Sequence, residues 1–165
     1  MAKYDLTAER LKELLHYDPE TGVFTWRVYR GGTAKQGTIA GGLIPAGYRI
    51  IRLGVNQYAH RLVWLYVYGR LPTQDIDHID GNRDNNAFAN LREATRSENL
   101  QNQRRAKSKI GPGVLGVSWA KHRNKWLAQI TYDGKQHNLG LYNTIEQASA
   151  AYLAAKREKH PFCTI

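Results

Sequence analysis

The sequence has only one cysteine, Cys163, among its 165 residues. A single cysteine excludes a disulfide within the chain, and it excludes a zinc site built from several thiolates. We therefore expect any metal site to use oxygen and imidazole ligands, and we expect no zinc.

Long apolar runs are absent as well. The longest run, residues 62–68, is far shorter than the roughly 20 residues that span a bilayer. The first 20 residues contain no apolar stretch of the kind that a signal peptide requires. We expect a cytoplasmic protein that has no membrane partner.

Acidic residues are scarce. The chain has 14 acidic residues against 24 Lys and Arg, which gives a net charge of +10. Nine Lys or Arg residues and only two acids lie between Arg92 and Lys125. This clustering favours a nucleic acid partner, because Lys and Arg displace the counterions condensed on phosphates. A basic surface that is merely solvated is the alternative.

The periodicity of the chain predicts an α+β protein. Thr7 is a good N-cap for a helix whose leucines at 11, 14 and 15 share one face. Alternating residues predict strands at 23–29 and 48–53, and an apolar segment at 61–68 predicts a short buried helix. Residues 31–47 are rich in glycine and show no clear element.

One segment holds the candidate chemistry. Asp77 and His78 are adjacent, a second strand is predicted at 90–94, and a capping box at 95–98 begins a helix that carries Asn99. A hairpin followed by a helix can bring Asp77 and Asn99 together, although they lie far apart in the chain.

Phosphodiester hydrolysis suits these residue types. The reaction needs a base with a pKa near neutrality, as histidine has, and a cation that offsets the charge on the phosphate. Mg²⁺ takes few protein oxygens and keeps several waters. We predict His78 as the base, Asp77 and Asn99 as metal ligands, and Asn90 as the amide that fixes the tautomer of His78. Each residue alone has a structural explanation, such as a turn cap, so the joint pattern carries the prediction.

Several spaced groups of residues resemble the HNH, or ββα-metal, endonucleases of phages and their self-splicing introns. The matching groups are residues 77–82, 90–92 and 97–99, preceded by 59–64, so the resemblance covers roughly residues 48–102. It implies that Asp77 and Asn99 bind one divalent metal ion, with Mg²⁺ expected and Mn²⁺ as the alternative. It implies equally that His78 activates water and that Asn90 orients His78.

The same resemblance implies a double-stranded DNA substrate, products with 5′-phosphate and 3′-hydroxyl ends, and a site-selective, homing-type role in a phage or mobile element. One such site acts on one strand, so a monomer, the expected state, is predicted to nick. His60 is interpreted as a packing residue, and Arg61 either contacts DNA phosphate or pairs with an acidic neighbour.

Residues 113–165 predict three strands and a helix, with Asp133-Gly134 as a hairpin turn. Residues 116–117, 125–126 and 139–140, with the helix around Tyr152, resemble the plant ethylene-response-factor, or apetala-type, DNA-binding domain. The resemblance implies that the sheet lies in the major groove of DNA. The candidate contacts are Trp119, Lys121, Arg123, Lys125, Gln129, Thr131 and Asn138. Trp126 and Leu139 are interpreted as core residues.

Several positions at which plant members carry base-reading arginines or a tryptophan hold smaller residues here, so the plant sequence preference is not transferable. These positions are Ser118, Ala120, Thr131 and Asn138.

A basic linker is predicted at residues 104–112, between an N-terminal region 1–103, with its nuclease core at 48–103, and a DNA-binding domain at 113–165. The linker residues suited to phosphate or minor-groove contact are Arg104, Arg105, Lys107 and Lys109.

The predicted function is therefore a metal-dependent endonuclease acting on double-stranded DNA. One alternative is a DNA-binding regulator on an inactive nuclease scaffold. Another is an RNA-directed nuclease or RNA binder, because many tyrosines can stack on single strands.

Overall fold

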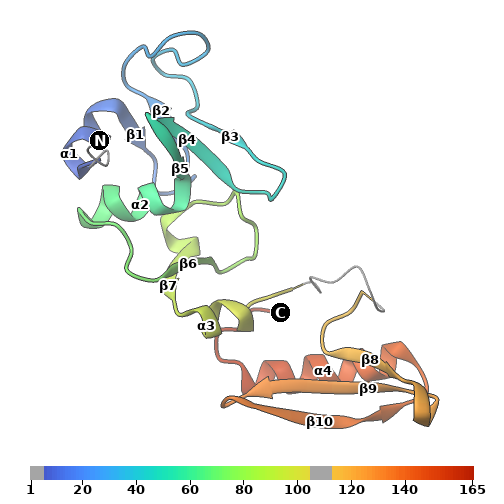
Figure 1. The fold of residues 1–165 in the computed structure, drawn as a ribbon. Coiled ribbons are helices and arrows are strands. Elements are labelled where there is room, and N and C mark those ends of the chain that lie inside the picture. The colour runs from blue at the N-terminus through green and yellow to red at the C-terminus, as the bar shows by residue number, and fades with distance from the viewer. Residues whose placement is uncertain (1–5, 105–112) are drawn as a thin grey trace. The chain divides into compact units, whose positions relative to one another are not determined.

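The structure, a computed structural model, describes residues 6–104 and 113–165 and divides into two compact units (Figure 1). The first unit is Met1–Arg96 and the second is Ser97–Ile165. The predicted α+β class is confirmed, because both units combine helices with antiparallel sheets.

The first unit begins with a helix and a hairpin. Helix α1 (Ala8–Leu14) starts at Thr7, whose hydroxyl accepts a hydrogen bond from the backbone N–H of Arg10. Strands β1 (Leu15–Tyr17) and β2 (Phe24–Trp26) then pair antiparallel. The sequence places Leu15 on the helix, but its backbone is extended, because it pairs with Trp26 of β2.

A three-stranded sheet follows, with the order β3 (Gly42–Leu43), β4 (Arg49–Leu53) and β5 (Val55–Tyr58). The glycine-rich stretch thus contains one short strand and an isolated bridge between Gly31 and Ala34.

Helix α2 (Ala59–Tyr68) forms the buried centre of this unit. It ends at Gly69, which adopts the left-handed conformation, with φ of 72°, that favours glycine. Its Leu62 and Val63 are fully buried in one cluster with Leu11 of α1, Phe24 of β2 and Ile51 of β4. The core therefore joins α1, the first hairpin and the three-stranded sheet. It supports a second hairpin, made of β6 (Asp75–His78), the short 3₁₀ helix η1 (Phe88–Asn90) and β7 (Leu91–Ala94).

The second unit opens with α3 (Arg96–Gln101), whose first residue still belongs to the first unit. A sheet in the order β10-β9-β8 follows, made of β8 (Val117–Ala120), β9 (Lys125–Tyr132) and β10 (Lys135–Tyr142). The 3₁₀ turn η2 (Lys121–Arg123) links β8 to β9. Helix α4 (Ile145–Lys159) packs on all three strands. The predicted order of three strands and a helix is confirmed.

The hairpin turn and the helix start of this unit follow from local sequence. Asp133 and Gly134 both have positive φ, as a tight two-residue hairpin requires. Thr144 caps α4 by accepting from the backbone N–H of Gln147.

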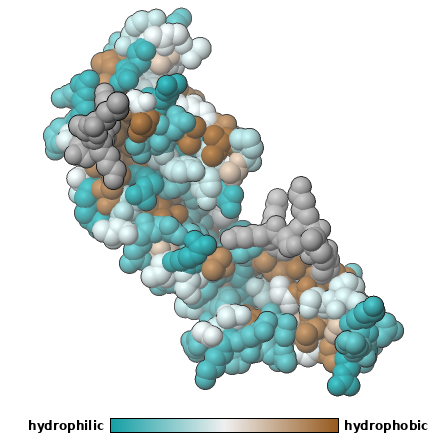
Figure 2. All heavy atoms as spheres, in the orientation of Figure 1, coloured by the Kyte–Doolittle hydropathy of each residue, from teal (hydrophilic) through white to brown (hydrophobic). Residues whose placement is uncertain are grey.

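The predicted linker residues Arg105, Lys107 and Lys109 lie outside the described residues, and the domain limits 103 and 113 stay a prediction. Within the described ranges, no helix is long and apolar enough to cross a membrane. On the face drawn in Figure 2, apolar residues are scattered among hydrophilic ones.

Candidate active site

The hairpin β6–β7 places the two central candidate residues at the end of a strand. In its antiparallel register, Asp77 faces Arg92 and His78 faces Leu91. Asp77 and His78 are both buried, although polar groups are costly to bury without partners. Each therefore needs a specific partner.

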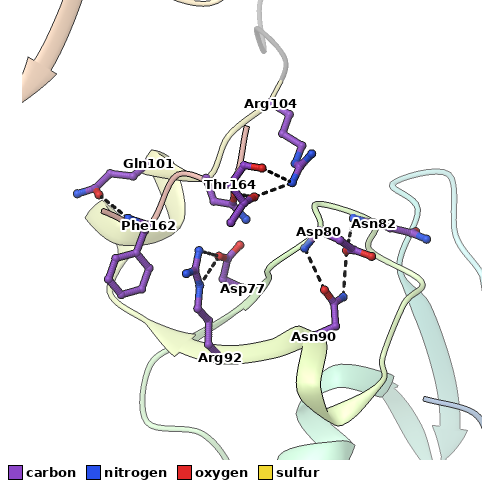
Figure 3. Close-up of polar contacts among 10 residues, drawn as sticks. Asp77, Asp80, Asn82, Asn90, Arg92, Gln101, Arg104, Phe162 and Thr164 are labelled. Atoms are coloured by element: carbon purple, nitrogen blue, oxygen red, sulfur yellow. Dashed lines mark hydrogen bonds and ion pairs between the residues drawn. The ribbon is translucent and has the colours of Figure 1, made fainter. Parts of the chain in front are cut away.

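Arg92 is the partner of Asp77 (Figure 3). Its Nε and Nη2 atoms donate to Asp77 Oδ2 over 3.0 and 2.8 Å. The antiparallel register explains the pair, since residues directly opposite each other project to the same side of a hairpin. The guanidinium neutralises a carboxylate that would otherwise be an expensive buried charge.

Asp77 suits a divalent cation of the magnesium type. A carboxylate is a hard oxygen ligand, and Mg²⁺ is commonly held by only one or two carboxylates plus waters and phosphate. In the part of the chain that the structure describes, no three His, Cys, Asp or Glu residues are grouped to hold a metal. The role of Asp77 as a metal ligand stays a prediction.

His78 lies in a largely aromatic setting. Its ring centroid is 5.2 Å from that of His60 and 6.0 Å from that of Tyr48. Burial lowers the pKa of His78, while its hydrogen bond to Asn86 Oδ1 and the carboxylates of Asp77 and Asp80 oppose this shift. The imidazole is consequently neutral at pH 7, which is the state that a general base requires.

His60, on α2, packs as the sequence predicts. Its ring stacks on Tyr58 with a centroid distance of 5.4 Å and lies 5.4 Å from Tyr48. Burial, with smaller effects from His78 and Arg61, lowers the pKa of His60 to about 3. A neutral, tightly packed ring agrees with the interpretation of His60 as a packing residue.

Asn90 differs from its predicted arrangement. Its amide nitrogen donates to Asp80 Oδ1, and its amide oxygen accepts from the Asp80 backbone N–H (Figure 3). The amide nitrogen also donates to the Asn85 carbonyl. These bonds close the loop between β6 and β7, and they use both the amide nitrogen and the amide oxygen of Asn90. The amide that contacts His78 is Asn86 instead, with 3.3 Å between Asn86 Oδ1 and His78 Nε2.

Sequence reasoning missed Asn86. It is one of several asparagines in a polar loop, and nothing local distinguishes it from its neighbours. What distinguishes it is burial, which arises from packing against the first hairpin.

Two further predicted residues lie on helices. Asn99 is half-buried on α3 and belongs to the second unit, so its role as metal ligand stays a prediction. Arg61 is half-buried on α2 and lines an open groove with Thr73, Gln74 and Arg96. Arg61 takes part in none of the ion pairs found among the described residues.

The predicted DNA contacts of the second unit fall into two groups. The first group lies on the sheet face opposite the helix. On β9, Lys125, Gln129 and Thr131 alternate with the buried Ala128 and Ile130. Asn138 of β10 pairs with Gln129 and so lies on the same face. The exposed Lys121 and Arg123 belong to the turn η2. Arg104 is exposed and donates to Thr164, within the same unit.

Trp119 departs from this pattern. It faces Trp126 in the register of β8 and β9, and their ring centroids lie 4.9 Å apart. Trp126 packs against the core cluster under α4, as does Leu139, which confirms both as core residues. Trp119 therefore lies on the helix side of the sheet, with 46% of its surface exposed, and not on the open face.

The open face carries a chain of amide side chains. Gln129 Nε2 donates to Asn138 Oδ1 over 2.6 Å, and Gln136 Nε2 donates to Gln129 Oε1 over 3.3 Å. Hydrogen bonds of this kind hold the amides in defined orientations.

Comparison with known proteins places the site in context. Residues 57–101 match the family model described as HNH endonuclease. The chain is 40% identical over 102 residues to protein 3.8 of Escherichia phage T7, covering 61% of this chain and 83% of that protein. It is 29% identical over 109 residues to the uncharacterized HNH endonuclease L560 of Acanthamoeba polyphaga mimivirus, covering 66% of this chain and 54% of that protein.

A solved structure of the HNH homing endonuclease I-HmuI, described by its DNA binding and cleavage, also matches. The TM-score is 0.41 at 23% identity, over 81% of this chain and 74% of that one.

Proposed function

The chain belongs to the HNH endonuclease family, and on this premise we propose that it hydrolyses phosphodiester bonds in double-stranded DNA with one bound divalent metal ion. The observation that carries the proposal is the adjacency of Asp77 and His78, both buried at the end of β6. The matched family segment contains both residues.

His78 accepts a proton from the attacking water in this proposal. Its buried ring is neutral near pH 7 and can therefore take the proton. Asp77 and Asn99 would hold the cation, and Arg92 keeps the carboxylate of Asp77 oriented. When bound, a divalent cation such as Mg²⁺ polarises water and offsets negative charge on the phosphate and the leaving oxygen. Asn90 acts on the loop between β6 and β7, which it closes through Asp80.

Departure of the 3′ oxygen leaves 5′-phosphate and 3′-hydroxyl ends. One such site cuts one strand at a time, so the expected product of a monomer is a nick.

The second unit supplies DNA affinity in the same proposal. Its cations Lys121, Arg123 and Lys125 suit phosphates, which position the protein without specifying a sequence. Gln129, Thr131 and Asn138 on the open sheet face suit base edges. Target selection would then reside mainly in the second unit.

Plasmid cleavage tests the proposal. Supercoiled and linear duplex DNA are incubated with wild type, His78→Ala and Asp77→Asn, each in Mg²⁺ and in EDTA. We expect wild type to nick in Mg²⁺ alone, and His78→Ala to lose at least about 100-fold in rate, as general-base removal typically costs. We expect Asp77→Asn to lose cleavage as well, because it removes the charged ligand of the proposed cation. His16→Ala, which changes an exposed histidine of β1, is the matched control and should cleave normally.

Tight duplex binding without metal-dependent cleavage of any substrate would contradict the proposal. That result would favour a DNA-binding regulator on a nuclease scaffold.

A further inference from the structure

We propose that Asn86 is a positioning residue that fixes the tautomer and direction of His78, and that the first hairpin, β1–β2, holds Asn86 in place. The proposal rests on the role of His78 as general base. It assigns a function to an amide that no sequence motif marks.

The burial of Asn86 is the first observation. Asn86 is 1% exposed, and it is among the largest fully buried side chains of the residues that the structure describes. A buried amide is costly unless its donors and acceptor are satisfied. Asn86 Nδ2 donates to the Asp84 carbonyl over 2.9 Å, and Asn86 Oδ1 faces His78 Nε2 at 3.3 Å.

The direction of this amide determines the tautomer of His78. Because Nδ2 donates to a carbonyl, the atom turned toward His78 is an acceptor. A neutral imidazole donates a hydrogen bond to an acceptor through its protonated nitrogen, so Nε2 carries the hydrogen. Nδ1 is then the basic nitrogen, and we assign to it the proton taken from water.

The first hairpin holds the backbone of Asn86. The hydroxyl of Tyr17, a buried residue of β1, donates to the Asn86 carbonyl over 2.8 Å. The turn of the hairpin reaches the same segment, since the backbone N–H of Phe88 donates to the Pro19 carbonyl over 3.0 Å.

Gly22 completes this contact. Its φ is +73°, and a Cβ at this position would lie 2.2 Å from the carbonyl carbon of Asn86 and 2.1 Å from the nitrogen of Ala87. Only glycine allows the turn to come so close. A chain of contacts thus runs from Tyr17 and Gly22 through Asn86 to His78.

Two aromatic neighbours limit the ring of His78 from other sides. His60 meets it edge to face, with an interplanar angle of 88°, and Tyr48 is tilted by 51°. Packing restricts the ring, but it does not choose between two tautomers. The hydrogen bond from His78 Nε2 to Asn86 Oδ1 favours the tautomer that carries the hydrogen on Nε2.

The tautomer can be measured directly. Full-length protein labelled with ¹⁵N-histidine is examined at pH 8 by long-range ¹H–¹⁵N NMR, which distinguishes protonated from unprotonated ring nitrogens. We expect His78 of wild type to be protonated at Nε2, and Asn86→Leu to show a mixture. Tyr17→Phe is a milder change that removes only the bond to the Asn86 carbonyl, and it should produce a smaller population of the other His78 tautomer. This second variant keeps the test decisive if Asn86→Leu does not fold. Asn56→Leu, at an exposed position of β5, is the matched control.

Cleavage kinetics supply the second measurement. Loss of an orienting partner typically costs roughly 10–100-fold, and we expect Asn86→Leu to lower kcat by about that factor with little change in KM. Wild-type His78 protonated at Nδ1, or an Asn86→Leu variant with unchanged tautomer and kcat, would overturn the proposal. A wild type that shows Nε2–H but cleaves no DNA would support the assigned hydrogen bond while overturning the proposed function.

Discussion

At the scale of single residues, the site gives two adjacent side chains different partners. Asp77 forms an ion pair with Arg92 across the hairpin. His78 is neutral because burial disfavours the imidazolium more than its neighbours favour it. Adjacent positions on one strand achieve this because their side chains project to opposite sides and meet different partners. The division of labour between ligand and base follows from these partners.

His60 leads to a prediction on stability. Its pKa in the folded protein is about 3, against 6.5 when unfolded, so the unfolded state binds a proton more readily between these values. Stability is therefore fully present above pH 6.5 and is lost as the pH falls, by up to about 1.4 kcal/mol per pH unit for one such group. His78, whose pKa is also lowered, contributes with the same sign.

Denaturant unfolding at pH 7.5 and at pH 5 measures the effect. We expect His60→Phe, which keeps an aromatic ring but cannot titrate, to lose less stability between the two pH values than wild type. His16→Ala serves as the control at an exposed histidine. An equal loss for His60→Phe and wild type would show that His60 is not held neutral.

At the scale of elements, the open sheet face of the second unit differs in chemistry from a DNA-binding surface that contacts bases through arginines. Gln129, Gln136 and Asn138 are linked by hydrogen bonds, and Leu127 and Leu141 lie in register on the same face. Amides pair well with the edge of adenine, and apolar groups contact the methyl of thymine, whereas arginine reads guanine. For the DNA contact proposed above, this composition predicts a preference for A·T base pairs.

Binding of full-length His78→Ala to a panel of duplexes tests this preference. We expect Gln129→Ala and Asn138→Ala each to reduce discrimination between A·T-containing and G·C-only duplexes by about 1–3 kcal/mol. Lys125→Ala should weaken all duplexes alike, because a phosphate contact carries no sequence information. If both amide variants discriminate between A·T-containing and G·C-only duplexes as well as the parent does, Gln129 and Asn138 do not contact the bases.

Elements with strong local patterns could be predicted from the sequence. The turn at Asp133 and Gly134 and the cap at Thr7 depend only on neighbouring residues, and both are confirmed. Leu15 could not be placed, because pairing with Trp26 overrides its helical periodicity. Trp119 was predicted as a DNA contact together with residues of the open face, but its partner Trp126 puts it on the helix side.

The candidate site shows the same limit. Asp77 and His78 stand out in the sequence because two chemical groups with complementary roles are adjacent. Asn86 does not, because its role depends on contacts with Tyr17 and Gly22, far away in the chain. Supporting residues of a site are set by tertiary packing, which a motif does not encode.

At the scale of the whole molecule, the dominant property is the excess of positive charge. A net charge of +10 attracts any polyanion, so affinity for DNA alone says little about where DNA binds. The proposed contact surface is more specific, because it uses the exposed cations Lys121, Arg123 and Lys125 at one end of the sheet. Whole-molecule attraction and local contact differ in how they respond to salt.

Salt dependence separates the two. Each phosphate that a cation neutralises contributes about −0.9 to the slope of log K against log salt concentration. A triple variant with alanine at 121, 123 and 125 should therefore flatten the slope by about 3. A matched variant carries alanine at Arg10, Lys12 and Lys35, which are exposed cations of the first unit. It lowers the net charge of +10 by the same three units and should leave the slope nearly unchanged.

The measurement is duplex binding by full-length His78→Ala from 50 to 200 mM salt. Equal flattening in both triple variants would mean that net charge alone governs binding, and the second unit would lose its assigned role. Flattening confined to the first variant would locate the phosphate contacts at the end of the sheet. Because the cations there flank the amide face, phosphate contact would then bring that face against the bases, which links affinity and selection within one unit.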